Sequence, residues 1–237
     1  MRGIVLAGGL GTRLYPTTKV VNKHILPIGN KPMFYHPLLT LVASGIKEIA
    51  VVSGPPFGNQ IKELLKYIPV DKNVQVTYIE QMKPAGMPDG ILSCAGFIKD
   101  KSVMVIAGDN LYGEDFKKEV KDFRNGALSF LRKVNDARRF GVAVYDVDGK
   151  LMGLIEKPEN FKTEWAVTGP HLFDNQVFKL IKKLKPSTRG ELEITDLNSE
   201  YAKMELLKLA KRTDYWQDMG TFDSLIEASQ YNKITKL

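Results

Sequence analysis

The chain contains 237 residues, of which 43% are hydrophobic and 26% charged, as is typical of a soluble globular protein with a sizeable core. That length allows one large α/β domain or two small ones. The net charge of +7 favours anionic partners such as nucleotides or sugar phosphates, although the basic residues are scattered and also fit a solvated lysine-rich surface. The sequence has no apolar run of about eighteen residues and no signal-peptide pattern, so we expect a cytoplasmic protein that binds no membrane.

Cysteine and histidine are scarce in this sequence. The only cysteine is Cys94, so no disulfide can form within the chain, which fits a reducing cytoplasm. The histidines are His24, His36 and His171, and a single cysteine with three histidines does not favour a zinc site.

The first 23 residues combine a strand pattern, a glycine-rich turn and two basic side chains. Residues 2–7 form an apolar run that ends in the sequence GGLGTR at 8–13. Glycines let the backbone approach an anion closely, and the charges of Arg13 and Lys23 suit phosphate oxygens. The spacing matches neither a Walker A loop nor a complete dinucleotide fingerprint, because Leu14 stands where a third glycine belongs. On this stretch alone, a polyphosphate site and an ordinary tight turn of an α/β domain both remain open.

Strand and helix patterns alternate through the first half of the chain. The apolar patterns predict strands at residues 2–7, 48–53, 74–79 and 103–107. They predict helices at residues 33–44, 61–68, 91–97 and 114–123. Pro37 allows a later start or a bend in the first helix, and Asp89, in the Pro- and Gly-rich loop 81–90, is a candidate cap for the third. This alternation predicts an open, largely parallel sheet with helices on both faces.

The second half of the chain adds hairpins to this plan. Strands are expected at 128–131, 142–147, 151–155 and 166–173, the last of them interrupted at Gly169-Pro170. Asp148-Gly149 is a hairpin signal between the second and third of these strands. Helices are expected at 176–184, 191–204 and 222–234, the last capped by Thr221. The sheet should therefore be mixed, and a single domain is the simplest interpretation.

Two carboxylates stand where an α/β protein places its chemistry. Asp109 directly follows the buried strand 103–107, and ligands of open α/β sheets bind beyond the carboxyl ends of strands. Asp218 lies in the turn before the last helix. Both have structural alternatives, a turn cap for Asp109 and a helix-entry residue for Asp218. Together they suit magnesium, which takes one or two protein carboxylates and completes its shell with phosphate oxygens and water. Glu156-Lys157 is a further charge pair, or an ordinary surface salt bridge.

A set of motifs in a fixed order resembles the sugar-1-phosphate nucleotidyltransferases over essentially the whole chain. These motifs are LAGGLGTRL at 6–14, Lys23 with Leu26-Pro27, KPM at 31–33, Gln81, GDN at 108–110, EKP at 156–158, VTG at 167–169, RGELEITD at 189–196 and the W-x-D-x-G turn at 216–220. The RGELEITD segment and the W-x-D-x-G turn indicate the sugar-nucleotide branch of the family, and GDN favours thymidylyl transfer.

The resemblance implies one Rossmann-like domain over residues 1–237, a three-layer α/β/α sandwich with a mixed, mostly parallel central sheet. Residues 1–110 would mainly bind the nucleotide, and residues 111–237 mainly the sugar phosphate. The implied reaction condenses dTTP with glucose 1-phosphate to dTDP-glucose and pyrophosphate, with Mg²⁺ as cofactor. An in-line attack on the α-phosphorus needs positioning and charge neutralisation rather than a protein nucleophile.

The resemblance also implies roles for individual residues. Asp109 and Asp218 would bind Mg²⁺. Arg13 would hold the β- and γ-phosphates, Lys23 would neutralise the α-phosphate, and Lys157 would hold the sugar phosphate. The other implied nucleotide-binding residues are Leu6, Gly8, Gly9, Gly11 and Thr12, with Gln81 and Gly86 as readers of the base. The other implied sugar-site residues are Gly141, Glu156 and Val167.

Some positions depart from the family pattern, and several functions stay open. MPDG at 87–90 follows Gly86, Phe140 precedes Gly141, and Pro170-His171 follows Gly169, so the preferred base and sugar are in question. UTP-, CTP- or GTP-dependent transfer is the nearest alternative, and a non-catalytic sugar-nucleotide-binding subunit is an alternative of another class. The missing third glycine argues against a nicotinamide-dependent oxidoreductase. The expected partners are a nucleoside triphosphate and a sugar 1-phosphate, without nucleic acid, and a homo-oligomer is possible.

Overall fold

The computed structural model describes residues 1–160 and 163–235. The chain divides into two compact units, each assembled from separate stretches of sequence. The unit that contains the glycine-rich turn, here the glycine-loop unit, comprises Arg2–Pro84, Ile106–Lys121 and Asp214–Leu237. The other, here the hairpin unit, comprises Met1, Ala85–Val105 and Asp122–Thr213. The strand β6, Val103–Ala107, contributes residues to both units.

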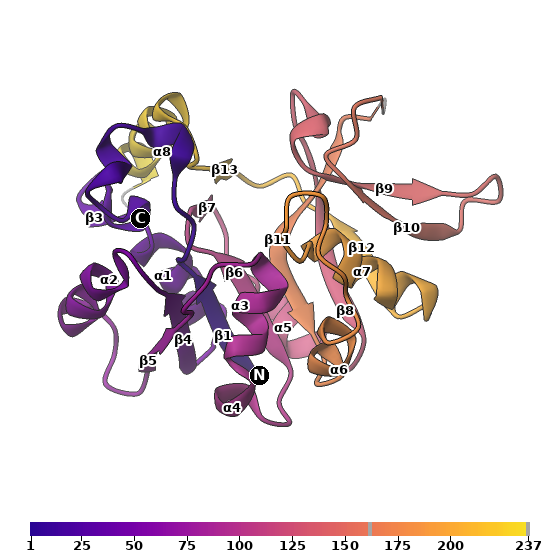
Figure 1. The fold of residues 1–237 in the computed structure, drawn as a ribbon, viewed down its shortest axis with the longest axis horizontal. Coiled ribbons are helices and arrows are strands. Elements are labelled where there is room, and N and C mark those ends of the chain that lie inside the picture. The colour runs from indigo at the N-terminus through magenta and orange to yellow at the C-terminus, as the bar shows by residue number, and fades with distance from the viewer. Residues whose placement is uncertain (161–162, 236–237) are drawn as a thin grey trace. The chain divides into compact units, whose positions relative to one another are not determined.

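The glycine-loop unit is built on three parallel strands. They lie side by side in the order β1, β4, β5 (Figure 1). Their bounds are β1 Arg2–Leu6, β4 Glu48–Ser53 and β5 Gln75–Glu80. The β1–β4 register pairs Gly3 with Ile49 and Leu6 with Val52. Because β1 and β4 are buried on both faces, their near-continuous apolar runs are the pattern that a parallel sheet requires.

The helices of this unit are α1 Tyr35–Ala43, α2 Gly58–Leu64, α5 Lys117–Asp122 and α8 Phe222–Thr235. They lie near the predicted positions: α1 and α5 are shorter than predicted, α2 begins three residues earlier, and α8 matches within one residue. Pro37 falls in the first turn of α1, where its missing N–H needs no partner, so the helix begins later than the predicted residue 33. The backbone N–H of Ser224 donates to the Thr221 hydroxyl at 3.3 Å, which confirms the predicted cap of α8.

Two pairs of short strands complete the glycine-loop unit, and the sequence patterns did not predict them. They are the antiparallel pairs β2 Pro27–Ile28 with β3 Lys31–Pro32, and β7 Asn110–Tyr112 with β13 Trp216–Asp218. The prediction of a turn at Asp218 was therefore wrong, because this residue ends β13. Strands of two or three residues show no readable alternation, and each of these is fixed by its partner.

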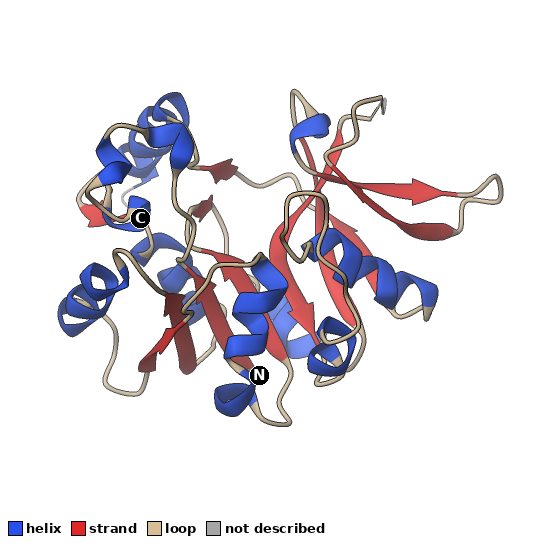
Figure 2. Ribbon diagram, viewed as in Figure 1, coloured by secondary structure: helices blue, strands red, loops and turns tan. Residues whose placement is uncertain are grey.

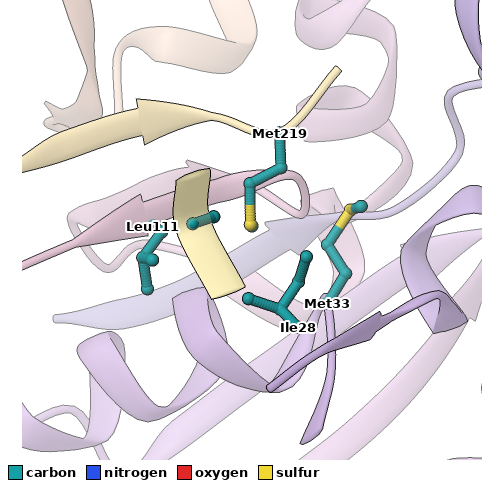
Figure 3. Close-up of a cluster of buried hydrophobic side chains, with 5 residues drawn as sticks. Ile28, Met33, Leu111 and Met219 are labelled. Carbon is teal, nitrogen blue, oxygen red and sulfur yellow. The ribbon is translucent and has the colours of Figure 1, made fainter. Parts of the chain in front are cut away.

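A small hydrophobic cluster holds these short strands to α8. Ile28, Met33, Leu111, Met219 and Ala228 are almost fully buried in it, and Figure 3 shows four of these side chains converging. Its members lie up to 200 positions apart in the sequence, from Ile28 to Ala228. The cluster therefore fixes the carboxyl-terminal segment 214–220 onto the first third of the sequence.

The hairpin unit contains mainly antiparallel strands. They pair in the order β10, β9, β11, β6, and β8 pairs with both β11 and β12. Their bounds are β8 Ala127–Lys133, β9 Gly141–Tyr145, β10 Leu151–Glu156, β11 Trp165–Phe173 and β12 Leu207–Lys211. Figure 2 shows β9 and β10 as the predicted hairpin around Asp148-Gly149. β11 continues through Gly169-Pro170, so the predicted interruption of the strand was wrong; the proline instead lies at a register shift between Thr168 and Leu172 along the β11–β8 pair.

The helices of the hairpin unit are α3 Met87–Ser93, α4 Ala95–Ile98, α6 Val177–Ile181 and α7 Ile194–Lys203. The predicted loop 81–90 extended too far, because α3 begins at Met87. Pro88 sits in the first turn of α3, where proline is well tolerated, so this proline starts the helix instead of preventing it. Asp89 consequently lies in the first turn, and Gly86 takes the cap position.

The predicted α/β class with a mixed sheet and flanking helices is confirmed. Parallel pairs dominate the glycine-loop unit and antiparallel pairs the hairpin unit. The assignment of residues 1–237 to one domain, divided near residue 110, stays a prediction. Within residues 1–160 and 163–235, no helix has the length and apolar character needed to cross a membrane.

We expect Met219→Ala to lower the free energy of unfolding by about 2–5 kcal/mol, because the side chain is fully buried in the cluster of Figure 3. Urea denaturation measures this change. Met152→Ala is the matched control, since Met152 is 54% exposed and its truncation should cost less than about 0.5 kcal/mol. Equal losses in the two variants would contradict the assigned core.

Candidate active site

The glycine-rich turn begins at the carboxyl ends of adjacent strands. The N–H of Ala7 donates to Val52 O at 2.7 Å, and the N–H of Gly108 donates to Leu6 O at 2.8 Å. The turn therefore starts level with the ends of β4 and of the β6 segment. Gly11 has φ +66°, a conformation that glycine adopts without a Cβ penalty. It directs the chain into the short 3-10 helix η1, Thr12–Leu14, on which Thr12 and Arg13 are exposed.

Lys23 lies directly under this turn and contacts Asp109. It begins the 3-10 helix η3, Lys23–Ile25, and its Nζ lies about 3.1 Å from the position that a Cβ on Gly9 would take. The same ammonium group donates a short hydrogen bond to Asp109 Oδ2. Burial alone would raise the pKa of the Asp109 carboxyl, but the adjacent Lys23 ammonium holds that pKa well below its usual range. Asp109 is therefore a carboxylate at any pH near neutrality.

Asp218 is brought next to Asp109 by the pairing of β7 with β13. In this register Asp218 faces Asn110, the residue after Asp109, and the N–H of Met219 donates to Asp109 O at 2.8 Å. Arg13 Nη2 lies 3.9 Å from Asp218 Oδ2. Gly220 leaves room for this arrangement, since a Cβ there would lie 2.5 Å from Arg13 Nη2. The structure thus gathers two carboxylates, one lysine and one arginine from four stretches of sequence at the glycine-rich turn.

This donor set fits a hard divalent cation. In the described ranges, 1–160 and 163–235, no group of three or more His, Cys, Asp and Glu side chains is arranged to hold a metal. Mg²⁺ commonly takes one or two protein carboxylates, here one just before β7 and one at the end of β13, and substrate phosphates with water fill its other positions. Asp109 and Asp218 are the residues that would hold it.

Gln81 is held close to the glycine-rich turn at the end of β5. Its N–H donates to Ser53 O at 2.9 Å, and its side chain is buried. Its Oε1 lies 3.0 Å from the position of a Cβ on Gly8. The predicted nucleotide residues Leu6, Gly8, Gly9, Gly11, Thr12, Arg13, Lys23 and Gln81 all belong to the glycine-loop unit.

Gly86, the second predicted base reader, belongs to the hairpin unit. It has φ +98°, and a Cβ there would lie 2.0 Å from Leu192 O, so only glycine fits. The N–H of Leu192 donates to Ala85 O at 2.8 Å. The segment after Pro84 is therefore hydrogen-bonded to the RGELEITD segment at residues 189–196.

The predicted sugar-site residues come together on adjacent strands of the hairpin unit. Gly141 begins β9, where it pairs with both Glu156 of β10 and Val167 of β11. Lys157 follows β10 with φ +44°, a strained conformation for a residue with a side chain. Its Nζ lies 3.3 Å from Glu156 Oε1, and its N–H donates to Phe140 O at 3.0 Å. Lys99 and Glu205 also adopt positive φ, so it is the pairing with Glu156 and Phe140 that places Lys157 beside the other sugar-site residues.

Arg189 is a further candidate site residue, to which the sequence motifs assigned no individual role. Its guanidinium group donates to both carboxylate oxygens of Glu193, at 3.2 and 2.8 Å, and lies 3.5 Å from Glu156 Oε1. Thr195 also lies beside Gly141, since its Cγ2 is 2.4 Å from the position that a Cβ on Gly141 would take. The RGELEITD motif that carries these residues was the available signal, but only the fold shows that it meets Glu156 and Gly141.

A separate cavity of about 480 Å³ lies in the glycine-loop unit, between α1 on one side and β7 with the three residues that follow it on the other. Among the residues that the structure describes, none of the predicted site residues lines it.

Comparisons with known proteins identify the family of this chain. The family model described as "Nucleotidyl transferase" matches residues 2–234. A glucose-1-phosphate thymidylyltransferase of Neisseria meningitidis is 39% identical over 98% of this chain and 82% of the relative. A relative of the same name from Mycolicibacterium smegmatis is 38% identical over the whole chain and 84% of its own length.

Solved structures give the same result. A structure assigned as a glucose-1-phosphate thymidylyltransferase of Bacillus anthracis, in complex with sucrose, is 40% identical with a TM-score of 0.86 and covers 98% of this chain and 94% of its own. A UDP-glucose pyrophosphorylase complexed with UDP-glucose shares the fold at 22% identity, with a TM-score of 0.83 and 98% of each chain covered. With a family match along nearly its whole length and relatives near 40% identity, this chain belongs to the nucleotidyl transferase family and is a sugar-1-phosphate nucleotidyltransferase.

Proposed function

We propose that this enzyme condenses dTTP with glucose 1-phosphate to give dTDP-glucose and pyrophosphate. The observation that carries the proposal is the meeting of Lys23, Arg13, Asp109 and Asp218 at the glycine-rich turn. Two cations beside a backbone without side chains suit a polyphosphate, and two carboxylates suit the metal that accompanies it. The names of the relatives near 40% identity support the thymidine nucleotide and glucose 1-phosphate as the substrates.

In this mechanism a phosphate oxygen of the sugar attacks the α-phosphorus, and pyrophosphate leaves from the opposite side. Lys23 neutralises charge that develops on the α-phosphate, and Arg13 holds the departing β- and γ-phosphates. The glycine-rich turn brings backbone N–H groups to the same anion. Each of these groups binds or neutralises, so the protein supplies no nucleophile.

Asp109 and Asp218 would hold Mg²⁺, which would supply neutralisation of phosphate charge at the reacting phosphoryl group. The low pKa of Asp109 keeps this carboxyl ionised and ready to bind a cation.

The strand ends of the hairpin unit supply the sugar 1-phosphate site. Lys157 holds the phosphate of the sugar, and Glu156, Gly141 and Val167 contact its hydroxyl groups. The position of Lys157 supports this role, because the lysine directly follows Glu156 and its N–H donates to Phe140 O, the residue before Gly141. Gln81 and Gly86 read the base, the amide of Gln81 offering both a donor and an acceptor.

Two alternatives differ from this proposal in substrate or in class. Transfer from UTP, CTP or GTP requires only a different base contact, and one methyl group changes selectivity by about 1–3 kcal/mol. A non-catalytic subunit that binds sugar nucleotides would keep the pocket without turnover, yet the charged residues that turnover needs are present. A homo-oligomer stays a possibility that either function allows.

A matrix of dTTP, UTP, CTP and GTP against glucose, mannose and galactose 1-phosphates, read by pyrophosphate release, tests the function. We expect the highest kcat/KM with dTTP and glucose 1-phosphate. A higher value for another pair would replace the substrate assignment. Release with no pair would support the non-catalytic alternative.

We expect Asp109→Asn to lower kcat by at least about 100-fold, since the amide neither binds Mg²⁺ well nor balances Lys23. Chelation by EDTA should stop the wild-type reaction, and added Mg²⁺ should restore it. Asp71→Asn, the same change at an exposed carboxylate of the same unit, is the control and should keep full activity. Near-normal turnover by folded Asp109→Asn would refute the metal assignment.

We expect Lys157→Gln to raise KM for the sugar phosphate by about 10- to 100-fold, the effect of losing a charge-assisted hydrogen bond. The KM for the nucleotide should change little. Lys150→Gln removes a comparable exposed lysine, which pairs with Glu205, and serves as the control. Unchanged kinetics in Lys157→Gln would remove this lysine from the site.

A further inference from the structure

Asn22 stands at the centre of a buried hydrogen-bond network beneath the glycine-rich turn. Its side chain is 7% exposed. Its Oδ1 accepts from the His24 backbone N–H at 2.9 Å and lies 2.8 Å from His24 Nδ1. An amide oxygen only accepts, so the imidazole carries its proton on Nδ1. Asn22 therefore caps the amino end of the short helix that presents Lys23, and it orients the His24 ring.

The other half of the Asn22 amide reaches the strands. Its Nδ2 donates to Ser53 Oγ at 3.3 Å and, in a longer contact, to Ala7 O at 3.5 Å. The Ser53 hydroxyl, itself fully buried, donates to Ala7 O at 2.8 Å. Ala7 is the residue before the glycines, so the network joins the Lys23 helix to the start of the turn. The backbone N–H of Asn22 also donates to the Gln60 side chain, at Oε1, over 2.8 Å, and this bond further anchors the Lys23 helix.

The His24 ring lies between the turn and the segment that carries Asp109. Its Cε1 is 3.8 Å from the position of a Cβ on Gly9, and its Cδ2 is 2.8 Å from that on Gly108. The ring is 1% exposed, and burial together with the neighbouring Lys23 charge lowers the His24 pKa to about 3. It is thus a neutral spacer whose thickness sets how closely the two backbone segments approach.

We propose that Asn22 and His24 are positioning residues for nucleotidyl transfer, holding the Lys23 ammonium group in register with the glycine-rich turn and with Asp109. The inference rests on the proposed function, because it concerns the transition state in which Lys23 acts. Neither side chain needs to touch the substrate. Both act by fixing where Lys23 and the backbone of Gly9 and Gly108 lie.

The test compares Asn22→Ala and His24→Leu with wild type in steady-state kinetics and in calorimetric binding of dTTP. We expect kcat to fall by up to about 100-fold, because a displacement of the Lys23 ammonium group by about 1 Å can have an effect of that size. Binding of dTTP should weaken by a smaller factor, since the charge that Lys23 neutralises grows in the transition state. His24→Asn should recover part of the loss, because its amide nitrogen can take the place of Nδ1 but the ring atoms that separate the Gly9 and Gly108 segments are missing. The double variant Asn22→Ala/His24→Leu should be no slower than the slower single variant, as expected of one coupled unit.

Ser44→Ala separates positioning from general stability. The buried Ser44 hydroxyl accepts from the Phe116 N–H at 3.0 Å and donates to Thr40 O at 2.7 Å, in the same unit but away from the turn. Its loss should lower stability and leave kcat unchanged. Wild-type kcat and dTTP affinity in folded Asn22→Ala, or no recovery in His24→Asn, would overturn the proposal. The proposed function is judged independently by wild-type turnover and by Asp109→Asn, and dTTP binding reports on the network even without turnover.

Discussion

The buried contact between Lys23 and Asp109 is the interaction on which the candidate site depends. It joins a short helix after β1 to the segment that follows β6, and the two side chains are largely buried, at 11% and 15% exposed. A buried ion pair of this kind is costly to break, by about 3–5 kcal/mol when one partner is removed, because the remaining charge is left without compensation. The same pair keeps Asp109 ionised and places an ammonium group under Gly9. One contact thus fixes both the metal-binding carboxylate and the phosphate-neutralising lysine of the proposed mechanism.

The short strand pair β7–β13 has a comparable role for the second carboxylate. Alone, two three-residue strands are too short to be stable, and the buried cluster around Met219 and Leu111 holds them in place. The position of Asp218 therefore depends on hydrophobic packing one residue away. In the hairpin unit, Gly141 plays the corresponding part, since its pairing with two strands brings Glu156 and Val167 together.

The network of Asn22 and His24 adds a neutral layer beneath these charged groups. A charged group there would have added to the field of Lys23 and Asp109, whereas a neutral imidazole oriented by an amide fixes geometry without changing the charge balance. Sequence patterns gave this pair no role, because an Asn and a His within a polar stretch are ordinary. Their importance rests on contacts with Ala7, Gly9, Ser53 and Gly108, residues scattered over 100 positions of the chain.

The sequence by itself determined the α/β class, the strands β4 and β6 to the residue, the β9–β10 hairpin and, through its motifs, the family. These features are local, since an apolar run, a turn dipeptide or a motif is readable without knowing its neighbours in space. Only the tertiary structure decided that Asp218 ends a strand beside Asp109, that α3 starts at Met87, and that Arg189 reaches Glu156. The physical reason is that these positions are set by pairing and packing between distant segments, and local propensity carries no record of which segments will meet.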